Sequence, residues 1–186
     1  MKYILFKQID TNDVVIDTFM ESQFSQVNKH VYKDNIIYTY DTTYVDDLKV
    51  LFEDLSGELL SDFLVYVSPS IEEKSYVSHI DQFNEILNKN LNLKRGVIHN
   101  QLLVSHLLHK NESNLRKFVL GKYDDQQYML DTIKTYLECN QNMMTASKEL
   151  FIHRNTLMMR LEKFKEVTGF DVKTFYEGFL IYHLLI

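Results

Sequence analysis

The stretch TASKELFIHRNTLMMRLEKF, residues 145–164, decides how the second half of the chain folds. Its first part, together with the three residues before it, predicts a short helix. Asn142 is its N-cap, and Met143, Ala146 and Leu150 form its buried stripe. The pattern then breaks briefly and resumes as a longer helix. Two helices joined by a tight break, the first short and rich in small residues, are typical of a helix-turn-helix.

The second helix follows a break near Ile152 and His153. Its buried face is predicted from apolar residues three or four positions apart, which are Leu157, Leu161 and Phe164. Gly169 is well placed to terminate this helix. Because Ala146 is small, the first helix can approach the second closely, with Ile152 and Leu157 filling the angle between them.

The same residues resemble a known family, the PucR/CdaR-type bacterial transcription regulators, in their C-terminal domain. The matching residues are the string 145–157, in which HRNTL at 153–157 is the most specific part, then Arg160-Leu161, Thr168-Gly169, Leu130-Asp131-Thr132 and Tyr136-Leu137. The resemblance covers residues 124–186, and the turn and second helix also look like the Fis-type helix-turn-helix. It implies a transcription regulator in which the helix beginning around His153 reads the major groove of double-stranded DNA.

Helical arithmetic independently gives the outward face of this helix: Asn155, Met159 and Glu162, flanked by Thr156, Met158 and Lys163. An asparagine can pair with an adenine edge, a threonine can contact phosphate or a thymine methyl, and Arg154 at the helix N-terminus suits a phosphate. The predicted DNA contacts are Lys148, His153, Arg154, Asn155, Thr156, Met159, Arg160 and Lys163.

One pair departs from the family pattern. Where relatives often carry Arg followed by an aromatic residue, this chain has Met158-Met159. Methionine can touch a thymine methyl but makes no bidentate contact to guanine. Glu162, on the same face, would accept from cytosine N4 or repel phosphate. The alternative is therefore a protein-interaction or regulatory module whose helix-turn-helix no longer binds DNA.

The charge distribution permits DNA binding without demonstrating it. The net charge is −6, and residues 1–100 carry nine basic and sixteen acidic side chains, whereas residues 142–165 carry five basic and two acidic. The lone Cys139, the absence of a recognisable signal peptide and the shortness of the apolar run Phe179–Ile186 favour a cytoplasmic protein without a membrane span. Because DNA half-sites come in pairs, we expect a homodimer.

The pattern along the chain predicts an α+β protein, with a mixed α/β domain at 1–112 and an all-helical domain at 113–186. The predicted strands are Lys2–Ile9, Val14–Phe19, Val31–Tyr40 with Asp34-Asn35 and Asp41 as bounding residues, and Phe63–Val67. The predicted helices before residue 112 are Val45–Leu55, Ile71–Leu93 and Asn100–His109. Capping boxes are predicted at Asp124 with Gln127 and at Thr174 with Glu177. The almost entirely apolar last helix, from Phe175, must be buried in its own domain or against a partner.

Residues 31–110 more faintly resemble a degenerate GGDEF domain, the middle domain of the same family. Diguanylate cyclases of this fold need a glycine-acid turn to hold metal and triphosphate, and no Gly-Gly-acid-acid run is present. We therefore expect no cyclase activity. The family's larger sensory domain, which the resemblance places upstream, has no room here. We expect no enzyme and no cofactor.

Two other groups of residues were weighed as sites. His99, His106 and His109 could share a helix face, but no further ligand completes a metal site, so polar-face histidines are favoured. Tyr38, Tyr40 and Tyr44 could stack on bases, but no Lys or Arg alternates with them, so packing in a strand is favoured.

Overall fold

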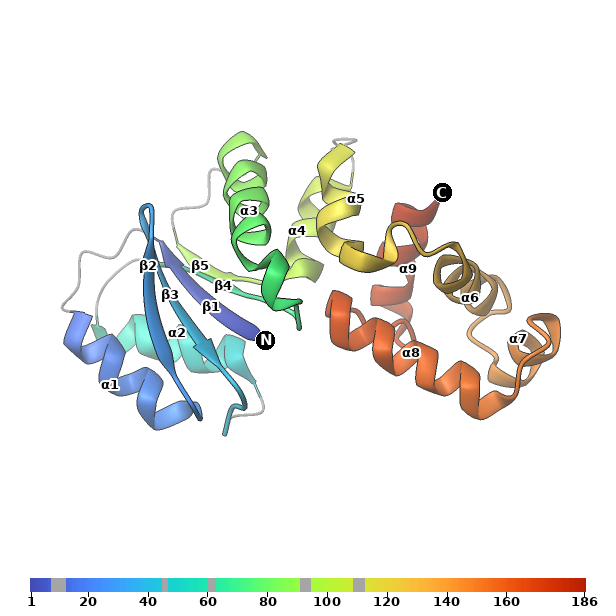
Figure 1. Cartoon of the computed structure of the whole chain (residues 1–186), viewed down its shortest axis with the longest axis horizontal. Coiled ribbons are helices and arrows are strands. Elements are labelled where there is room, and N and C mark those ends of the chain that lie inside the picture. The colour runs from blue at the N-terminus through green and yellow to red at the C-terminus, as the bar shows by residue number, and fades with distance from the viewer. Residues whose placement is uncertain (8–12, 45–46, 60–62, 91–94, 109–112) are drawn as a thin grey trace. The chain divides into compact units, whose positions relative to one another are not determined.

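The computed structural model describes residues 1–7, 13–44, 47–59, 63–90, 95–108 and 113–186. These residues form two compact units. The sheet unit comprises Met1–Val77 and Leu87–His99, and the helical unit comprises Ser78–Ile86 and Asn100–Ile186. The predicted α+β class is confirmed, with a mixed sheet in the N-terminal part and helices after it (Figure 1). The functional domain boundary predicted after residue 112 stays a prediction.

The sheet unit is built on a five-stranded sheet of order β2-β3-β1-β4-β5. Its strands are β1 (Lys2–Lys7), β2 (Asn28–Tyr32), β3 (Asn35–Tyr40), β4 (Leu64–Val67) and β5 (Gly96–Ile98). β1 pairs antiparallel with both β3 and β4, and β5 runs parallel to β4. Four consecutive residues of β1, 3–6, have no exposed surface. A continuous apolar run of this kind is typical of a central strand covered on both faces.

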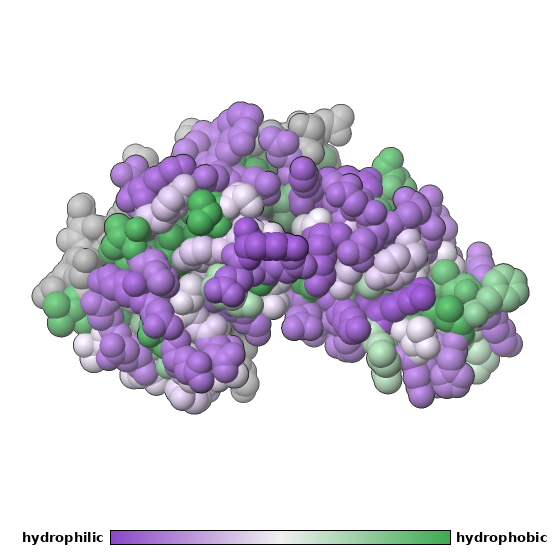
Figure 2. Space-filling model, viewed as in Figure 1, coloured by the Kyte–Doolittle hydropathy of each residue, from purple (hydrophilic) through white to green (hydrophobic). Residues whose placement is uncertain are grey.

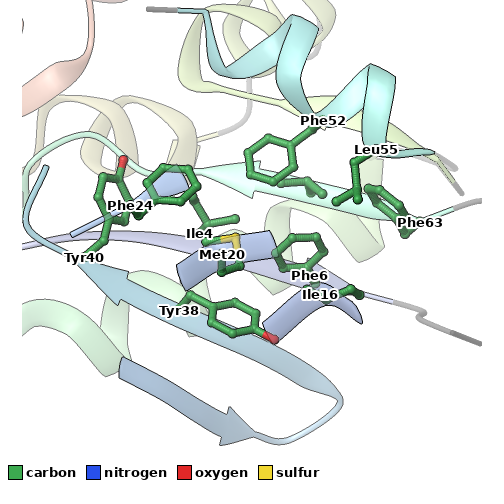
Figure 3. Close-up of a cluster of buried hydrophobic side chains, with 11 residues drawn as sticks. Ile4, Phe6, Ile16, Met20, Phe24, Tyr38, Tyr40, Phe52, Leu55 and Phe63 are labelled. Carbon is green, nitrogen blue, oxygen red and sulfur yellow. The ribbon is translucent and has the colours of Figure 1, made fainter. Parts of the chain in front are cut away.

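Two helices, α1 (Asp13–Gln23) and α2 (Leu48–Leu59), pack on one face of this sheet (Figure 3). The buried cluster between them joins Ile4, Phe6, Tyr38 and Tyr40 of the sheet to Ile16 and Met20 of α1 and to Phe52 and Leu55 of α2. Phe6 meets the rings of Phe52 and Tyr38 edge-on, with centroids 5.6 and 5.7 Å apart. Aromatic pairs in this geometry stabilise a core beyond their buried area.

Two strand predictions in this unit are wrong. Residues 14–19 lie in helix α1, because a helix brings Ile16 and Met20, four positions apart, onto the sheet together. This packing outweighs the strand preference of the β-branched residues. Residues 31–40 form a hairpin rather than one strand, since the chain turns between β2 and β3 with Lys33 at a φ of +53°.

The helical unit contains most of the remaining elements. They are α4 (Asn100–Leu107), α5 (Ser113–Leu120), the 3-10 helix η2 (Gly121–Tyr123), α6 (Gln127–Glu138), α7 (Met143–Glu149), α8 (Arg154–Thr168) and α9 (Phe175–Leu185). Residues 78–86 of α3 (Tyr76–Asn90), which follows the 3-10 helix η1 (Glu73–Ser75), also belong to this unit. The helices predicted at 45–55, 71–93 and 100–109 are present as α2 (Leu48–Leu59), α3 and α4, but α3 begins at Tyr76 rather than at Ile71. The predicted ends at Ile9, Val45, Leu93 and His109 lie outside the described residues.

One of the two predicted capping boxes is wrong. α6 begins after Gln126, whose side chain makes no capping hydrogen bond, and Asp124 instead forms an ion pair with Arg116 at 2.9 Å. The other prediction holds for its N-cap, because the Thr174 hydroxyl accepts a hydrogen bond from the Glu177 N–H at 3.4 Å. The carboxylate of Asp124 is therefore bound by the nearby cation Arg116 and does not cap α6.

Candidate nucleic-acid interface

The close approach of α7 to α8 depends on the small residue Ala146. Its side chain has no exposed surface, and neither has that of Leu157 on α8. Protein interiors are close-packed, so a larger side chain at this position would force the two helices apart. Met143 and Leu150, predicted on the same buried stripe, are only half-buried. Ala146 and Ser147 are thus the buried residues of α7, and both are small.

Short-range hydrogen bonds set where α7 begins. The Asn142 side chain accepts hydrogen bonds from the N–H groups of Met144 and Thr145, both at 3.0 Å, which confirms the predicted N-cap. Just before it, the Gln141 amide donates to the backbone carbonyls of Val172 and Thr174 at 2.8 and 3.0 Å. These bonds tie the α6–α7 loop to the segment that precedes α9.

α8 has a defined cap at each end. His153 precedes it, and its ring Nδ1 accepts a hydrogen bond from the Asn155 N–H at 3.2 Å. A neutral imidazole with an accepting Nδ1 carries its proton on Nε2, which can donate to a phosphate oxygen. At the other end Gly169 has a φ of +81°, and this left-handed residue terminates the helix as predicted.

The faces of α8 are those predicted from its spacing. Leu157, Leu161 and Phe164 are buried. Most residues predicted to contact DNA are exposed: Lys148 on α7, His153 before α8, and Arg154, Asn155, Thr156, Met159 and Lys163 on α8. Met158 and Met159 have 49% and 56% of their surface exposed, so the apolar pair that departs from the family pattern does face solvent.

Arg160 is the exception among the predicted contacts, because its side chain is bound to α6. Its Nη1 donates to the Thr132 hydroxyl at 2.7 Å, and its guanidinium carbon lies 5.5 Å from the centre of the Tyr128 ring. Thr132 is fully buried and donates in turn to the Tyr128 carbonyl at 2.7 Å. A hydrogen bond combined with a cation–π contact holds α8 against α6.

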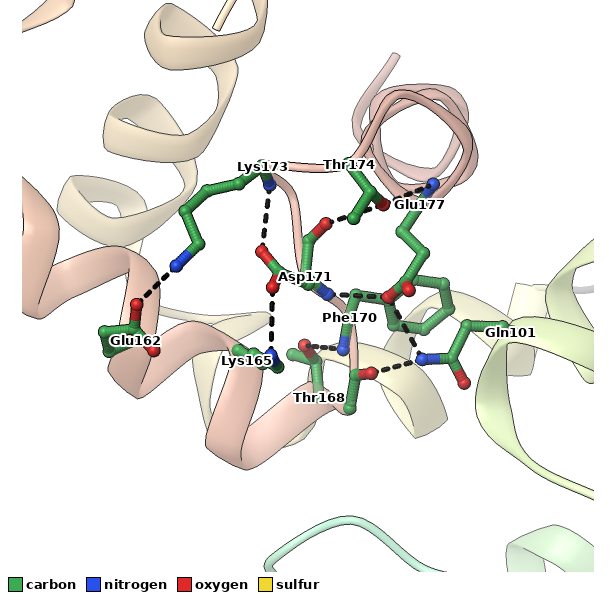
Figure 4. A network of polar contacts seen from close by, with 10 residues as sticks. Gln101, Glu162, Lys165, Thr168, Phe170, Asp171, Lys173, Thr174 and Glu177 are labelled. Carbon is green, nitrogen blue, oxygen red and sulfur yellow. Dashed lines mark hydrogen bonds and ion pairs between the residues drawn. The ribbon is translucent and has the colours of Figure 1, made fainter. Parts of the chain in front are cut away.

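Lys165 and Glu162, toward the C-terminal end of α8, are paired with residues that follow the helix (Figure 4). Lys165 contacts Asp171 at 2.9 Å, and Lys173 contacts Glu162 at 2.5 Å. Partial burial by itself would raise the pKa of Asp171. The hydrogen bonds from Lys165 and from the Lys173 N–H outweigh this effect and keep that pKa below its usual value. The hydrogen bond to Glu162 raises the pKa of Lys173. The negative charge of Glu162, which the sequence left uncompensated on the outward face, is therefore neutralised by Lys173.

Three other cations of α7 and α8 behave differently. The side chains of Lys148, Arg154 and Lys163 make no hydrogen bond or ion pair within the described part of the chain. All three are exposed. Their charges are consequently available to an anionic ligand, whereas those of Lys165 and Lys173 are already compensated.

The last helix is only partly buried within its own unit, so burial of its remaining apolar face against a partner stays a prediction. Leu180 and Ile181 are buried, but Phe175 is 82% exposed, and Tyr176 and Phe179 are also exposed. Gly178 lets α9 approach α6 closely, because a Cβ there would lie 2.9 Å from Leu137 Cδ2. Sequence reasoning missed this glycine, since its close neighbour is about forty residues away along the chain.

The other candidate sites are not assembled. Tyr38 and Tyr40 pack in the sheet core as predicted, whereas Tyr44 lies outside the strands and is exposed. Among the described residues, no three His, Cys, Asp or Glu side chains come together as a possible metal site. Nδ1 of His106 bonds instead to the Leu102 carbonyl at 2.9 Å, and His109 lies outside the described residues.

Comparison with known proteins agrees with this geometry. Residues 127–168 have the arrangement of a helix-turn-helix domain, with α7 and α8 as its two motif helices. Residues 129–185 match the PucR C-terminal helix-turn-helix domain family. In the described ranges, no helix has both the length and the apolar character needed to cross a membrane.

Several curated relatives are similar to this chain. The DNA-binding transcriptional activator AdeR of Bacillus subtilis is 26% identical over 97% of this chain and 43% of its own length. The purine catabolism regulatory protein of the same organism is 38% identical over 28% of this chain and 10% of its own. The carbohydrate diacid regulator of Escherichia coli is 37% identical over 34% of this chain and 16% of its own. The chain thus spans less than half the length of these relatives.

Proposed function

We propose that this chain is a DNA-binding transcription regulator that reads the major groove with the N-terminal half of α8. The observation that carries the proposal is the separation of charges on the helix-turn-helix. Lys148, Arg154 and Lys163 are exposed and unpaired within the described residues, while Lys165 and Lys173 are neutralised by acids. The relatives named as regulators support the same function.

The spacing of the unpaired cations suits a duplex. Arg154 and Lys163 are nine residues apart on one helix, which corresponds to about 13 Å along its axis. Nine residues are about two and a half helical turns, so the two side chains project from opposite sides of α8 and can reach phosphates on the two walls of the major groove. The free N–H groups at the start of α8 and the Nε2 of His153 can donate to phosphate oxygens. Asn155, Thr156 and Met159 then remain for the base edges.

A salt titration with matched variants tests this proposal. Binding of the full chain to fluorescent duplex DNA is measured by anisotropy at several salt concentrations. Arg154→Ala and Lys163→Ala should each weaken binding and reduce the slope of log affinity against log salt by about one. Lys165→Ala removes a cation from the same helix that is already paired, so its slope should equal that of the parent. Equal slopes for all four proteins would contradict the proposal.

The alternative function is a protein-interaction module that has lost DNA binding. The exposed Met158 and Met159 favour it, because they replace hydrogen-bonding groups on the outward face with flexible apolar ones. The same titration separates the two functions. A parent protein without salt-dependent affinity for duplex DNA would support the alternative.

We also propose that the regulator acts as a homodimer through α9. Helix-turn-helix proteins commonly bind two half-sites about 34 Å apart as a two-fold dimer. The side chains of Phe175 and Phe179 form an exposed apolar row, their ring centroids 6.5 Å apart, that a second copy can cover. Light scattering should give a dimer for the parent and a folded monomer for Phe179→Asp. A parent that stays monomeric at micromolar concentration would exclude this assembly.

Two further properties follow from the proposed role. A protein that binds chromosomal DNA in a bacterial cell acts in the cytoplasm. The relatives are named as regulators, and the chain has no Gly-Gly-acid-acid run. Purified protein should therefore turn over no nucleoside triphosphate, and formation of a cyclic dinucleotide would contradict this expectation.

A further inference from the structure

Phe151 is the most exposed large apolar side chain among the described residues, with 95% of its surface open to solvent. It lies in the turn between α7 and α8, where its neighbours Leu150 and Ile152 are half-buried. A phenyl ring left in water forgoes the favourable free energy of burial. Packing within the described part of the chain therefore does not account for an aromatic residue at this position.

The backbone at Phe151 is also unusual. Its φ is +53°, a left-handed conformation that glycine and asparagine adopt more readily than a bulky residue. Two hydrogen bonds fix the turn: the Phe151 N–H donates to the Lys148 carbonyl at 3.1 Å, and the Ile152 N–H donates to the Ser147 carbonyl at 3.0 Å. Helix-turn-helix turns often contain glycine. Here a residue less suited to this conformation presents its ring outward.

The surroundings of Phe151 are positively charged. Lys148 lies three residues before it and Arg154 three residues after it, both exposed and without a partner among the described residues. The nearby Glu149 accepts a hydrogen bond from the thiol of Cys139 at 3.2 Å. Figure 2 shows hydrophobic residues beside hydrophilic ones in the region of α7. An apolar group between cations suits a ligand that combines negative charge with apolar surface.

We propose that Phe151 contacts the apolar surface of duplex DNA, its thymine methyl groups or deoxyribose rings, at the edge of the major groove. The inference rests on the proposed function. Phe151 precedes the N-cap His153 by two residues, so their Cα atoms are at most about 7 Å apart. When the start of α8 enters the groove, the turn lies beside the groove wall. A phenyl ring can there pack on a thymine methyl, a contact known for phenylalanine in the major groove.

The test compares the full chain with variants on a duplex selected by the parent from a random-sequence library. Phe151→Asn and Phe151→Gly remove the ring and accept the left-handed backbone. Each should bind about tenfold more weakly, as expected for losing about 50 Å² of buried apolar surface. Their salt slope should equal that of the parent, because no charge is lost. Phe151→Tyr should retain affinity, and Val31→Asn, which removes an exposed apolar side chain of the sheet unit, should change nothing.

A second arm distinguishes the two apolar surfaces of DNA. The same duplex is prepared with uracil in place of thymine, which removes the methyl groups. If the ring contacts a methyl, the tenfold difference in affinity between the parent and Phe151→Asn should disappear on this duplex, whatever both proteins lose through other methyl contacts. If the ring contacts deoxyribose, the tenfold difference between parent and variant persists.

The outcomes that overturn the inference are separate from those that overturn the proposed function. Parent affinity in both Phe151→Asn and Phe151→Gly, together with a loss in Arg154→Ala, would overturn the DNA contact of the ring and leave the proposed function standing. Failure of the parent to select or bind any duplex would overturn the proposed function and this inference together. Thermal unfolding of each variant checks that the binding-deficient proteins remain folded.

Discussion

The two ends of α8 use their charged side chains in different ways. In the N-terminal part, Arg154 projects into solvent without a partner among the described residues. In the C-terminal part, Lys165 is paired with Asp171, and Glu162 is paired with Lys173. Surface ion pairs contribute little to stability, so the pairing matters mainly for where charge remains. The helix thus leaves the charges of Arg154 and Lys163 uncompensated, and that of Arg154 lies at its start, where the N–H groups also favour an anion.

The largest effect on stability and DNA binding is expected from displacing α8 itself. Ala146→Leu inserts a bulky side chain into a fully buried contact. We expect a loss of about 3 kcal/mol in the free energy of unfolding, at the upper end for overpacked cores, and loss of DNA binding. Urea denaturation and anisotropy measure the two effects. Thr145→Leu, one position earlier and exposed, is the control; a similar loss in that variant would disprove the packing explanation.

A smaller effect is expected from Arg160, the one predicted DNA contact that is bound to α6. Arg160→Ala removes its hydrogen bond to Thr132 and its contact with the Tyr128 ring, and should destabilise the fold by about 1–2 kcal/mol. DNA affinity should fall because α8 is less firmly held, but the salt slope should stay that of the parent. Arg160→Lys keeps the charge without the planar group and should recover little.

A double-mutant cycle with Thr132→Val distinguishes positioning from direct contact. If Arg160 acts through Thr132, the effect of Thr132→Val on DNA affinity should disappear once Arg160 is alanine. Additive effects, or a salt slope reduced by about one in Arg160→Ala, would instead indicate that the guanidinium touches a phosphate.

The smallest effect is expected where a paired charge is set free. Lys173→Ala leaves Glu162 without its partner on the outward side of α8. Its carboxylate should then repel phosphate and weaken DNA binding about twofold to threefold at low salt. Adding Glu162→Gln should restore the affinity of the parent. Unchanged affinity in the single variant would mean that Glu162 lies too far from the DNA to matter.

Much of the helix-turn-helix was predictable because its determinants are local. The cap at Asn142, the stop at Gly169 and the buried face of α8 follow from side chains within one or two turns of each other. The strand predicted at residues 14–19 failed for the opposite reason. Its β-branched residues favour extended structure locally, but the sheet buries Ile16 and Met20 together only if the segment is helical.

The amino-acid sequence by itself determined that residues 142–169 form two helices around a small residue and which residues face outward. Only the tertiary structure decided which of the outward groups are free. Arg160 lies at the border of the buried face, and its guanidinium donates a hydrogen bond to Thr132 on the neighbouring α6. Glu162 is neutralised by Lys173, which the turn at Gly169 brings back beside it. Spacing fixes the direction of a side chain on its helix, but the partner it meets depends on segments that folding brings together.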